Sequence, residues 1–105
     1  MTAPLRGQVY RVDVGHGLEP WLIVSNNRRN RTLSDVLAVR ISTSSKHAEL
    51  PTWVPLSAAD PVVGYIVTDN LERIRRSVLG PIVGTAAPST ILAVNAALKT
   101  VLSIP

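Results

Sequence analysis

Apolar and polar residues alternate near the start of the chain as strands require. Residues 9–14 alternate apolar with polar or amphipathic side chains, which predicts a half-buried strand. Residues 21–24 form a continuous aromatic and β-branched run typical of a central strand. Between them, two glycines flank His16, and Asp13 is placed to accept backbone N–H bonds from the loop. The pattern predicts two strands joined by a glycine-hinged lid.

A third strand is predicted over residues 34–42, where the alternation returns. Val36, Ala38, Arg40 and Ser42 then share one face, because side chains two residues apart point the same way. This phase places Arg40 and Ser42 on the same side at the end of the strand.

The second half of the chain predicts shorter strands. Residues 50–56 contain two prolines, which favours a short edge strand, and residues 64–67 form another short apolar run. Residues 71–76 fit either a turn or a strand, and residues 78–83 are expected to bend at a Gly-Pro pair.

The last segment has helical periodicity beginning at Pro88, a residue suited to a first helical turn. Its apolar stripe consists of Ile91, Leu92, Val94, Leu98, Val101 and Leu102. Strands followed by one amphipathic helix predict an α+β fold that is β-rich and mostly antiparallel.

Composition narrows the class of protein. A chain of 105 residues, 46% hydrophobic and 17% charged, is expected to fold as one domain over residues 1–105. Cysteine is absent, which excludes disulfides and thiolate metal sites, and the two histidines lack spaced acidic partners, so no metal or cofactor is expected. The start of the chain shows no secretory segment and no apolar run is long enough to span a membrane, which predicts a cytoplasmic protein.

The net charge of +4 favours an acidic partner. Arg28, Arg29 and Arg31 crowd into a predicted loop after the second strand and could neutralise the phosphates of a nucleic acid. A solvated loop that keeps the protein soluble explains the same three arginines equally well.

Five short motifs occur in an order that belongs to a known family. They are residues 6–10 (Arg-Gly-Gln-Val-Tyr), 20–26 (Pro-Trp-Leu-Ile-Val-Ser-Asn), 41–43 (Ile-Ser-Thr), 50–52 (Leu-Pro-Thr) and 69–71 (Asp-Asn-Leu). In these motifs and in its length the chain resembles the MazF/PemK toxins, which are small ribosome-independent endoribonucleases of toxin–antitoxin systems.

The resemblance implies a small, mostly antiparallel β-barrel of the CcdB/PemK type with a C-terminal helix, assembled as a homodimer. It implies metal-independent cleavage of single-stranded RNA, in which the ribose 2′-OH attacks the adjacent phosphate and leaves a 2′,3′-cyclic phosphate and a 5′-OH. A cognate antitoxin is the implied protein partner, and DNA is expected only through the toxin–antitoxin complex.

The family places an arginine before the second-strand proline and a Thr or Ser at the end of the third strand. Ser42 matches the second position, with Thr43 beside it, but Glu19 stands where the arginine is expected. Arg40, in phase with Ser42, could replace the missing cation. Glu19 could then be a general base, could mark a protein that binds without cleaving well, or could mean that catalytic groups lie elsewhere in the lid.

Further candidates for RNA contact are His16 in the lid, Asn70, and Trp53, which could stack a base if its face is exposed. Asn70 could instead cap a turn, and Trp53 could pack in the core. The alternative function is a non-catalytic module of the same fold that docks an antitoxin, DNA or a protein target such as gyrase.

Overall fold

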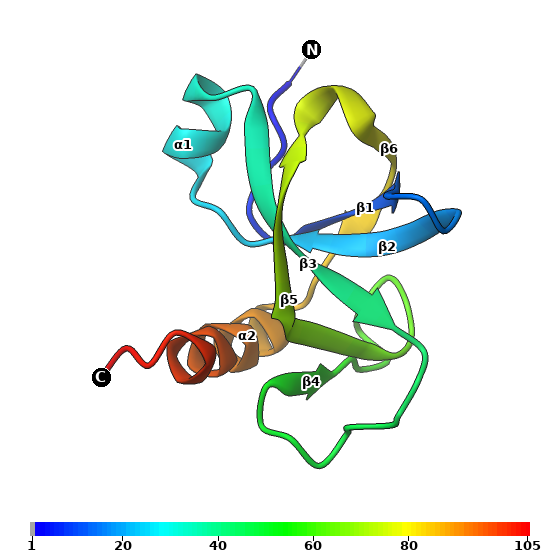
Figure 1. Cartoon of the computed structure of the whole chain (residues 1–105), viewed down its shortest axis with the longest axis vertical. Coiled ribbons are helices and arrows are strands. Elements are labelled where there is room, and N and C mark those ends of the chain that lie inside the picture. The colour runs from blue at the N-terminus through cyan, green and yellow to red at the C-terminus, as the bar shows by residue number, and fades with distance from the viewer. Residues whose placement is uncertain (1) are drawn as a thin grey trace.

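Six strands form one antiparallel sheet in the computed structural model, which describes residues 2–105 (Figure 1). Along the sheet the order is β4-β5-β3-β2-β1-β6, and every neighbouring pair is antiparallel. The strands are β1 (Gln8–Asp13), β2 (Leu18–Ile23), β3 (Asp35–Ser42), β4 (Trp53–Pro55), β5 (Tyr65–Arg75) and β6 (Leu79–Thr85). The pairing within residues 2–105 leaves β4 and β6 as edges, so the α+β class is confirmed and the barrel is not.

The lid between β1 and β2 has the expected construction. The Asp13 carboxylate accepts the N–H groups of Gly15 (2.7 Å) and Gly17 (3.1 Å). These hydrogen bonds hold the pKa of Asp13 below its ordinary value. Both glycines have positive φ, 118° and 89°, a region that other residues rarely adopt.

The arginine-rich segment is a helix, so its prediction as a loop is wrong. Helix α1 (Asn27–Thr32) begins after Asn26, whose side chain caps it by accepting the Arg29 N–H at 2.8 Å. Asn30 is fully buried, and its side-chain amide donates to the Ser25 carbonyl at 3.0 Å. The polar residues that suggested a loop are the cap and the anchor of this short helix.

β5 is one long strand rather than a short strand followed by an ambiguous segment. Its register against β3 shifts between Val39 and Arg40, and residues 68–70 have no ladder partner on β3. This bulge bends β5 sharply, as Figure 1 shows. A 3-10 turn, η1 (Arg76–Val78), connects β5 to β6. A bend was expected in β6, and the structure has a strand there with two register shifts against β1.

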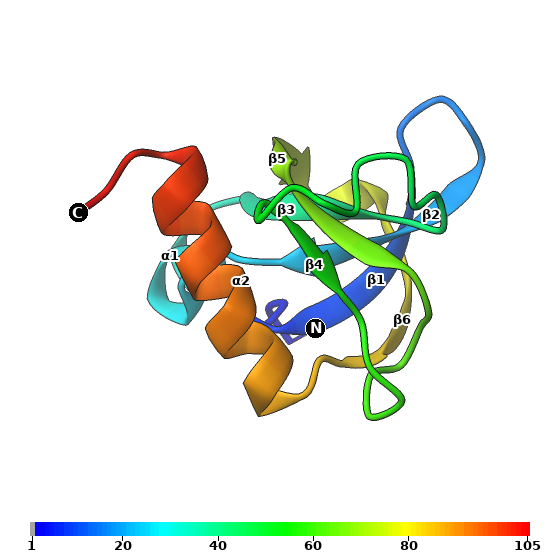
Figure 2. The same cartoon turned by 90° about the horizontal axis from the view of Figure 1, so that it is seen from below.

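Both faces of the sheet are covered by apolar side chains. On one face, helix α2 (Pro88–Val101) packs against β4 and β5 (Figure 2). The buried cluster there contains Val9, Leu22, Val39, Ile41, Val54, Ile66, Ala86, Val94 and Ala97. The second cluster contains Val12, Trp21, Ile23, Val36, Ala38 and Ile74.

Helix α2 confirms the predicted terminal helix, but its buried stripe is narrower than predicted. Leu92 and Leu102 are 69% and 52% exposed and lie outside the packed face, whereas Val94 and Ala97 are buried. No helix in residues 2–105 combines the length and apolar character needed to cross a membrane.

The start of α2 is held by a carboxylate from a distant loop. Asp60 accepts hydrogen bonds from the Ala87 N–H and the Thr90 hydroxyl, both at 2.7 Å, and from the Ser57 N–H at 2.8 Å. Partial burial raises the pKa of Asp60, but the hydrogen bonds from Ala87, Ser57 and Thr90 outweigh it and lower the pKa overall. Ala87 itself offers no capping side chain, so Asp60 performs that role.

We expect Asp60→Asn to lower the free energy of unfolding at neutral pH by about 1–2 kcal/mol, the usual size of a lost cap or charged hydrogen bond. Because the folded-state pKa is lowered, this stabilisation is complete above the ordinary carboxyl pKa of about 3.9 and disappears as pH falls through the folded value. Urea unfolding at neutral and acid pH measures both effects. Glu49→Gln, at an exposed loop carboxylate, is the control, and equal stabilities of Asp60→Asn and the unmodified chain would contradict the assignment.

Candidate active site

A polar pocket of about 250 Å³ lies between the lid, β2, β3 and the bulge of β5. Its lining consists of Val14, His16, Glu19, Trp21, Arg40, Asn70 and Glu72. Four residues singled out from the sequence, at positions 16, 19, 40 and 70, therefore come together in one place. They come from the lid, β2, β3 and β5, and the pairing of the strands brings them together.

The register of the sheet explains this convergence. Arg40 on β3 lies directly opposite Trp21 on β2, and Glu19 precedes Trp21 by two residues on the same face. On the other side of Arg40, the β5 bulge carries Asn70 out of the regular ladder and towards the pocket.

Arg40 is the centre of a short polar network. Its Nη1 lies 4.0 Å from Glu19 Oε2. With the Asn70 amide in the orientation that satisfies both neighbours, its oxygen accepts from Arg40 Nε at 2.9 Å and its nitrogen donates to Glu72 Oε2 at 3.0 Å. Asn70 is thus a positioning residue that holds the guanidinium, whereas the Glu19 contact is longer than a hydrogen bond.

Glu19 and Arg40 keep contact with solvent, with side chains 34% and 31% exposed. An ion pair of this length and exposure contributes little stability, so the two groups separate at small cost. Arg40 can therefore meet an anion while Glu19 remains free to accept a proton.

Ser42 and Thr43 lie beside the pocket rather than in its lining. Ser42 ends β3, two residues beyond Arg40 on the same face, and its hydroxyl oxygen accepts the Ser44 N–H at 3.1 Å. This role leaves the hydroxyl hydrogen available for a ligand. Thr43 is exposed just beyond the strand.

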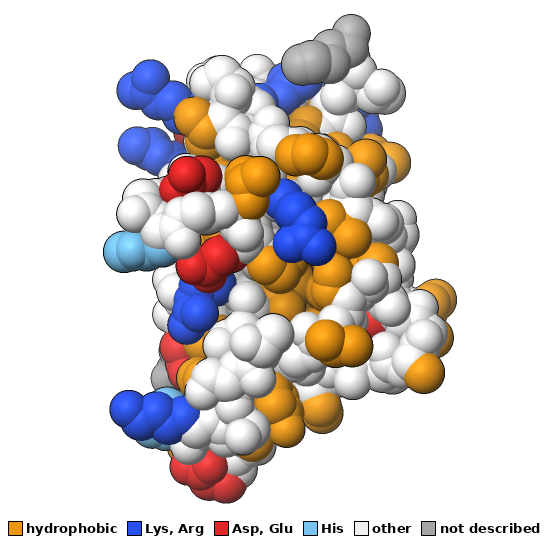
Figure 3. Space-filling view, turned by 90° about the vertical axis from the view of Figure 1, so that its right-hand side faces the viewer, with side chains coloured by type: hydrophobic (Ala, Val, Ile, Leu, Met, Phe, Trp, Pro, Cys, Tyr) orange, Lys and Arg blue, Asp and Glu red, His pale blue; other side chains and the backbone are white. Residues whose placement is uncertain are grey.

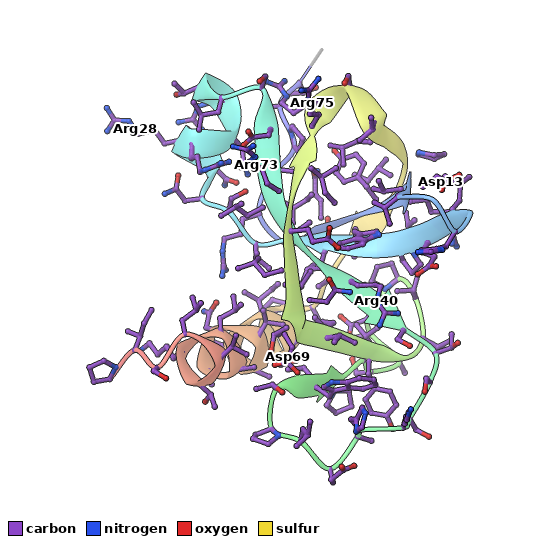
Figure 4. The ribbon with its side chains drawn as sticks, viewed as in Figure 1. Asp13, Arg28, Arg40, Asp69, Arg73 and Arg75 are labelled. Atoms are coloured by element: carbon purple, nitrogen blue, oxygen red, sulfur yellow. The ribbon has the colours of Figure 1, made fainter. Side chains whose placement is uncertain are left out.

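The three arginines of α1 lie away from the pocket. Arg29 is bound to Asp35, with Nη2 2.6 Å from Oδ1 and Nη1 3.1 Å from the carbonyl oxygen, so its role in this structure is to fasten α1 to β3. Arg28 and Arg31 are exposed. Figure 4 shows Arg28, Arg73 and Arg75 towards one end of the molecule, whereas Arg40 lies nearer its middle.

A second, open hollow of about 700 Å³ occurs at that end. Its lining consists of Ser34, Asp35, Arg73, Arg75, Arg76 and Ser77. Sequence reasoning missed its arginines because residues 71–76 fitted a turn as well as a strand. The signal that could have found them is the alternation of Arg73 and Arg75, which strand geometry brings to one side.

Trp53 does not meet the condition set for base stacking. Its side chain is only 9% exposed, and its ring packs edge-on to His47 (centroids 5.5 Å apart) and tilted to Tyr65 (6.3 Å). It also lies outside the pocket. The core interpretation of Trp53 therefore holds, and the stacking interpretation does not.

Three lining residues, Val14, Trp21 and Glu72, were not assigned a site role from the sequence. Glu72 follows the bulge, and a bulge leaves no pattern in the sequence that would place its carboxylate near Arg40. Trp21 is a core residue, as its strand run predicts, and it also lines the pocket. Within residues 2–105, no three His, Asp or Glu side chains gather as metal ligands would.

Comparisons with known proteins agree with this architecture. A family model described as the PemK-like, MazF-like toxin of type II toxin–antitoxin systems matches residues 5–102. Endoribonuclease MazF4 of Mycobacterium tuberculosis and endoribonuclease MazF1 of Mycobacterium bovis are each 50% identical over 105 residues, which is 100% of this chain and 98% of theirs.

Solved structures give the same result. A mycobacterial endoribonuclease in complex with its cognate antitoxin superimposes with a TM-score of 0.94 at 50% identity, over 98% of each chain. The MazF of a Deinococcus radiodurans MazE–MazF complex shares the fold, with a TM-score of 0.86 at 20% identity over 100% of both chains. The resemblance found in the sequence motifs is therefore confirmed, and the chain belongs to the PemK-like, MazF-like toxins of type II toxin–antitoxin systems.

Proposed function

We propose that this endoribonuclease toxin cleaves single-stranded RNA without a metal ion, by attack of a ribose 2′-OH on the adjacent phosphate. The O2′–P bond forms as the P–O5′ bond breaks, leaving a 2′,3′-cyclic phosphate and a 5′-OH. The observation that carries the proposal is Arg40, held by Asn70 at 2.9 Å and left only loosely paired with Glu19 beside the lid.

Each proton and charge in this reaction has a candidate group. Arg40 offsets the charge that develops on the phosphorane oxygens, and the Ser42 hydroxyl donates a further hydrogen bond to them. The Glu19 carboxylate accepts the proton of the 2′-OH. His16, on the exposed lid, is the proposed acid: its imidazolium form gives a proton to the departing O5′ and becomes the neutral imidazole.

Glu19 fits a base better than a misplaced phosphate clamp. A carboxylate repels a phosphodiester and cannot clamp it. Glu19 lies 4.0 Å from Arg40 and is partly solvated, so no tight salt bridge occupies its oxygens. Its oxygens are free to accept, which the base requires. The cation that the family pattern places at position 19 is then supplied across the sheet by Arg40.

RNA outside the pocket meets a basic end of the molecule. Arg73, Arg75 and Arg76 line the open hollow at the far end of β5, and Arg28 and Arg31 are exposed on α1. These arginines are suited to flanking phosphates. Because these contacts are electrostatic, they position the strand without reading its sequence.

A homodimer is supported by exposed apolar side chains around the lid and the β6 end of the sheet. They are Val14, Leu18, Val78 and Ile82. Figure 3 shows hydrophobic side chains gathered on the face that these elements form. Soluble chains seldom leave such a patch uncovered, so a second copy is the proposed cover.

The remaining proposals concern setting and partners. We propose that residues 1–105 act as one toxin domain in the cytoplasm, neutralised by a cognate antitoxin, since a related mycobacterial endoribonuclease was solved with its own. An acidic antitoxin segment that folds on docking would complement the net charge of +4. DNA would be contacted only through that complex.

The purified protein is expected to cut a long single-stranded RNA in EDTA into discrete fragments with 5′-OH ends, measured by end labelling before and after phosphatase. Arg40→Ala should slow this cleavage by about 10²–10³-fold, the usual effect of removing one donor to a developing charge. Arg11→Ala, which changes net charge equally outside the pocket, is the control. RNA left intact by the unmodified protein would instead favour a non-catalytic binding module.

Glu19→Gln should lower the single-turnover cleavage rate by about 10²–10⁴-fold, because the amide keeps the shape of the side chain but cannot take a proton. Glu19→Arg should be equally slow if Glu19 is the base. Gel-based rates on one defined RNA compare the three proteins. Wild-type rates in Glu19→Gln, or a gain in Glu19→Arg, would show that the carboxylate is dispensable.

Ser42→Ala should slow cleavage by about tenfold or more through loss of a hydrogen-bond donor to the phosphate, with thermal unfolding unchanged. Thr43→Ala is the matched variant, since it removes the neighbouring hydroxyl beyond the end of β3. A loss confined to Thr43→Ala would move the role to that residue.

A further inference from the structure

Trp21 carries the buried polar atom for which the fold provides no partner. Its side chain is 0% exposed, and within residues 2–105 its indole Nε1 is the buried side-chain nitrogen or oxygen with no hydrogen-bond partner. Buried donors are almost always satisfied, because an unpaired one has lost its water without replacement. Here the exception belongs to a residue that lines the candidate pocket, and it therefore points to a ligand.

The position of Trp21 defines which ligand atom could be involved. Its Cα lies directly opposite that of Arg40 in the β2–β3 ladder, and both side chains line the pocket. Directly opposed residues have side chains close together on one face of a sheet. An oxygen held by the Arg40 guanidinium is thus next to the indole.

We propose that the Trp21 indole N–H donates a hydrogen bond to a non-bridging oxygen of the phosphate undergoing transfer. This inference rests on the proposed function and adds a catalytic residue to it. Trp21 keeps its proton throughout, and its contribution is a fixed dipole directed at charge that grows as the phosphorane forms.

The charge balance of the pocket gives such a donor a purpose. Glu19 and Glu72 place two carboxylates in the pocket lining, which contains one arginine, Arg40, and no lysine. Arg40 is also partly engaged by Asn70. A further arginine or lysine here would pair with the two carboxylates. A neutral N–H does not form such a pair, and it can still stabilise the phosphorane oxygens.

The indole is covered in the free protein, and the cover is easily moved. Glu19 and Arg40 are each about one-third exposed and lie 4.0 Å apart, without a hydrogen bond between them. A phosphate that engages Arg40 separates this pair and reaches the buried N–H. Catalytic contacts of this kind commonly tighten only when the substrate is bound.

The first test is Trp21→Phe, which keeps an aromatic core residue and removes the donor. At saturating RNA we expect the single-turnover rate to fall by about tenfold or more, with KM and the cleavage sequence unchanged. Ile23→Val is the matched control, because it removes volume from the same buried cluster and no donor. A wild-type rate in Trp21→Phe, or a change confined to KM or to the cleavage sequence, would overturn the assignment.

Phosphorothioate substrates identify the oxygen. Sulfur accepts hydrogen bonds poorly, so one diastereomer at the scissile phosphate should slow the unmodified protein and cause no additional loss in Trp21→Phe. Equal slowing of both proteins by each diastereomer would exclude a contact between the indole and either non-bridging oxygen.

A measurement on the unmodified protein covers the case in which Trp21→Phe does not fold. The chain has two tryptophans, so its ¹⁵N spectrum has two indole N–H signals. Addition of an uncleavable RNA with a 2′-deoxy sugar at the scissile position should shift the Trp21 signal downfield and leave that of Trp53 nearly unmoved. An unmoved Trp21 signal under saturation would overturn the inference, whereas absence of cleavage by the unmodified protein would overturn the proposed function instead.

Discussion

The pocket depends on three residues that β5 inserts against β3. Residues 68–70 have no partners on β3, and they bring Asn70 to the side of Arg40. The insertion is fastened from the other side by Thr52, whose carbonyl accepts both the N–H and the hydroxyl of the buried Thr68. Asp69 accepts the Thr52 hydroxyl at 3.0 Å. Without this bulge the ladder would continue regularly, and no amide would hold the guanidinium.

Close packing at the end of β3 adds a second constraint on the same region. A Cβ at Gly64 would collide with the Ser42 carbonyl oxygen, and φ at this glycine is 123°. Only glycine therefore fits at this position, immediately before β5. The position of Ser42 relative to Arg40 thus follows from backbone contacts on both strands, and the site is built on the sheet instead of a loose loop.

The motifs and periods in the sequence were sufficient for the fold class, the terminal helix, the lid with Asp13 and the gathering of Glu19 with Arg40 and His16. The fold class, the helix and the lid depend on local pattern, which the sequence carries directly. The gathering of Glu19, Arg40 and His16 followed instead from the fold that the family resemblance implies, because it depends on the pairing of β2 with β3. The helix at α1 was missed because a six-residue helix with a polar cap has the composition of a loop. The bulge, and with it Glu72 and the pocket edge of Trp21, depends on a register shift between strands that are distant in the chain.

The central claim is that the scissile phosphate is bound at Arg40 rather than at Arg73, Arg75 and Arg76 in the open hollow. A crystal structure with an RNA carrying a 2′-deoxy sugar at the cleavage position tests it directly. The account predicts the phosphate within hydrogen-bond distance of the Arg40 guanidinium, with Glu19 near the position of the 2′-oxygen. A scissile phosphate seated in the hollow of Arg73, Arg75 and Arg76, with the Arg40 pocket empty, would contradict it.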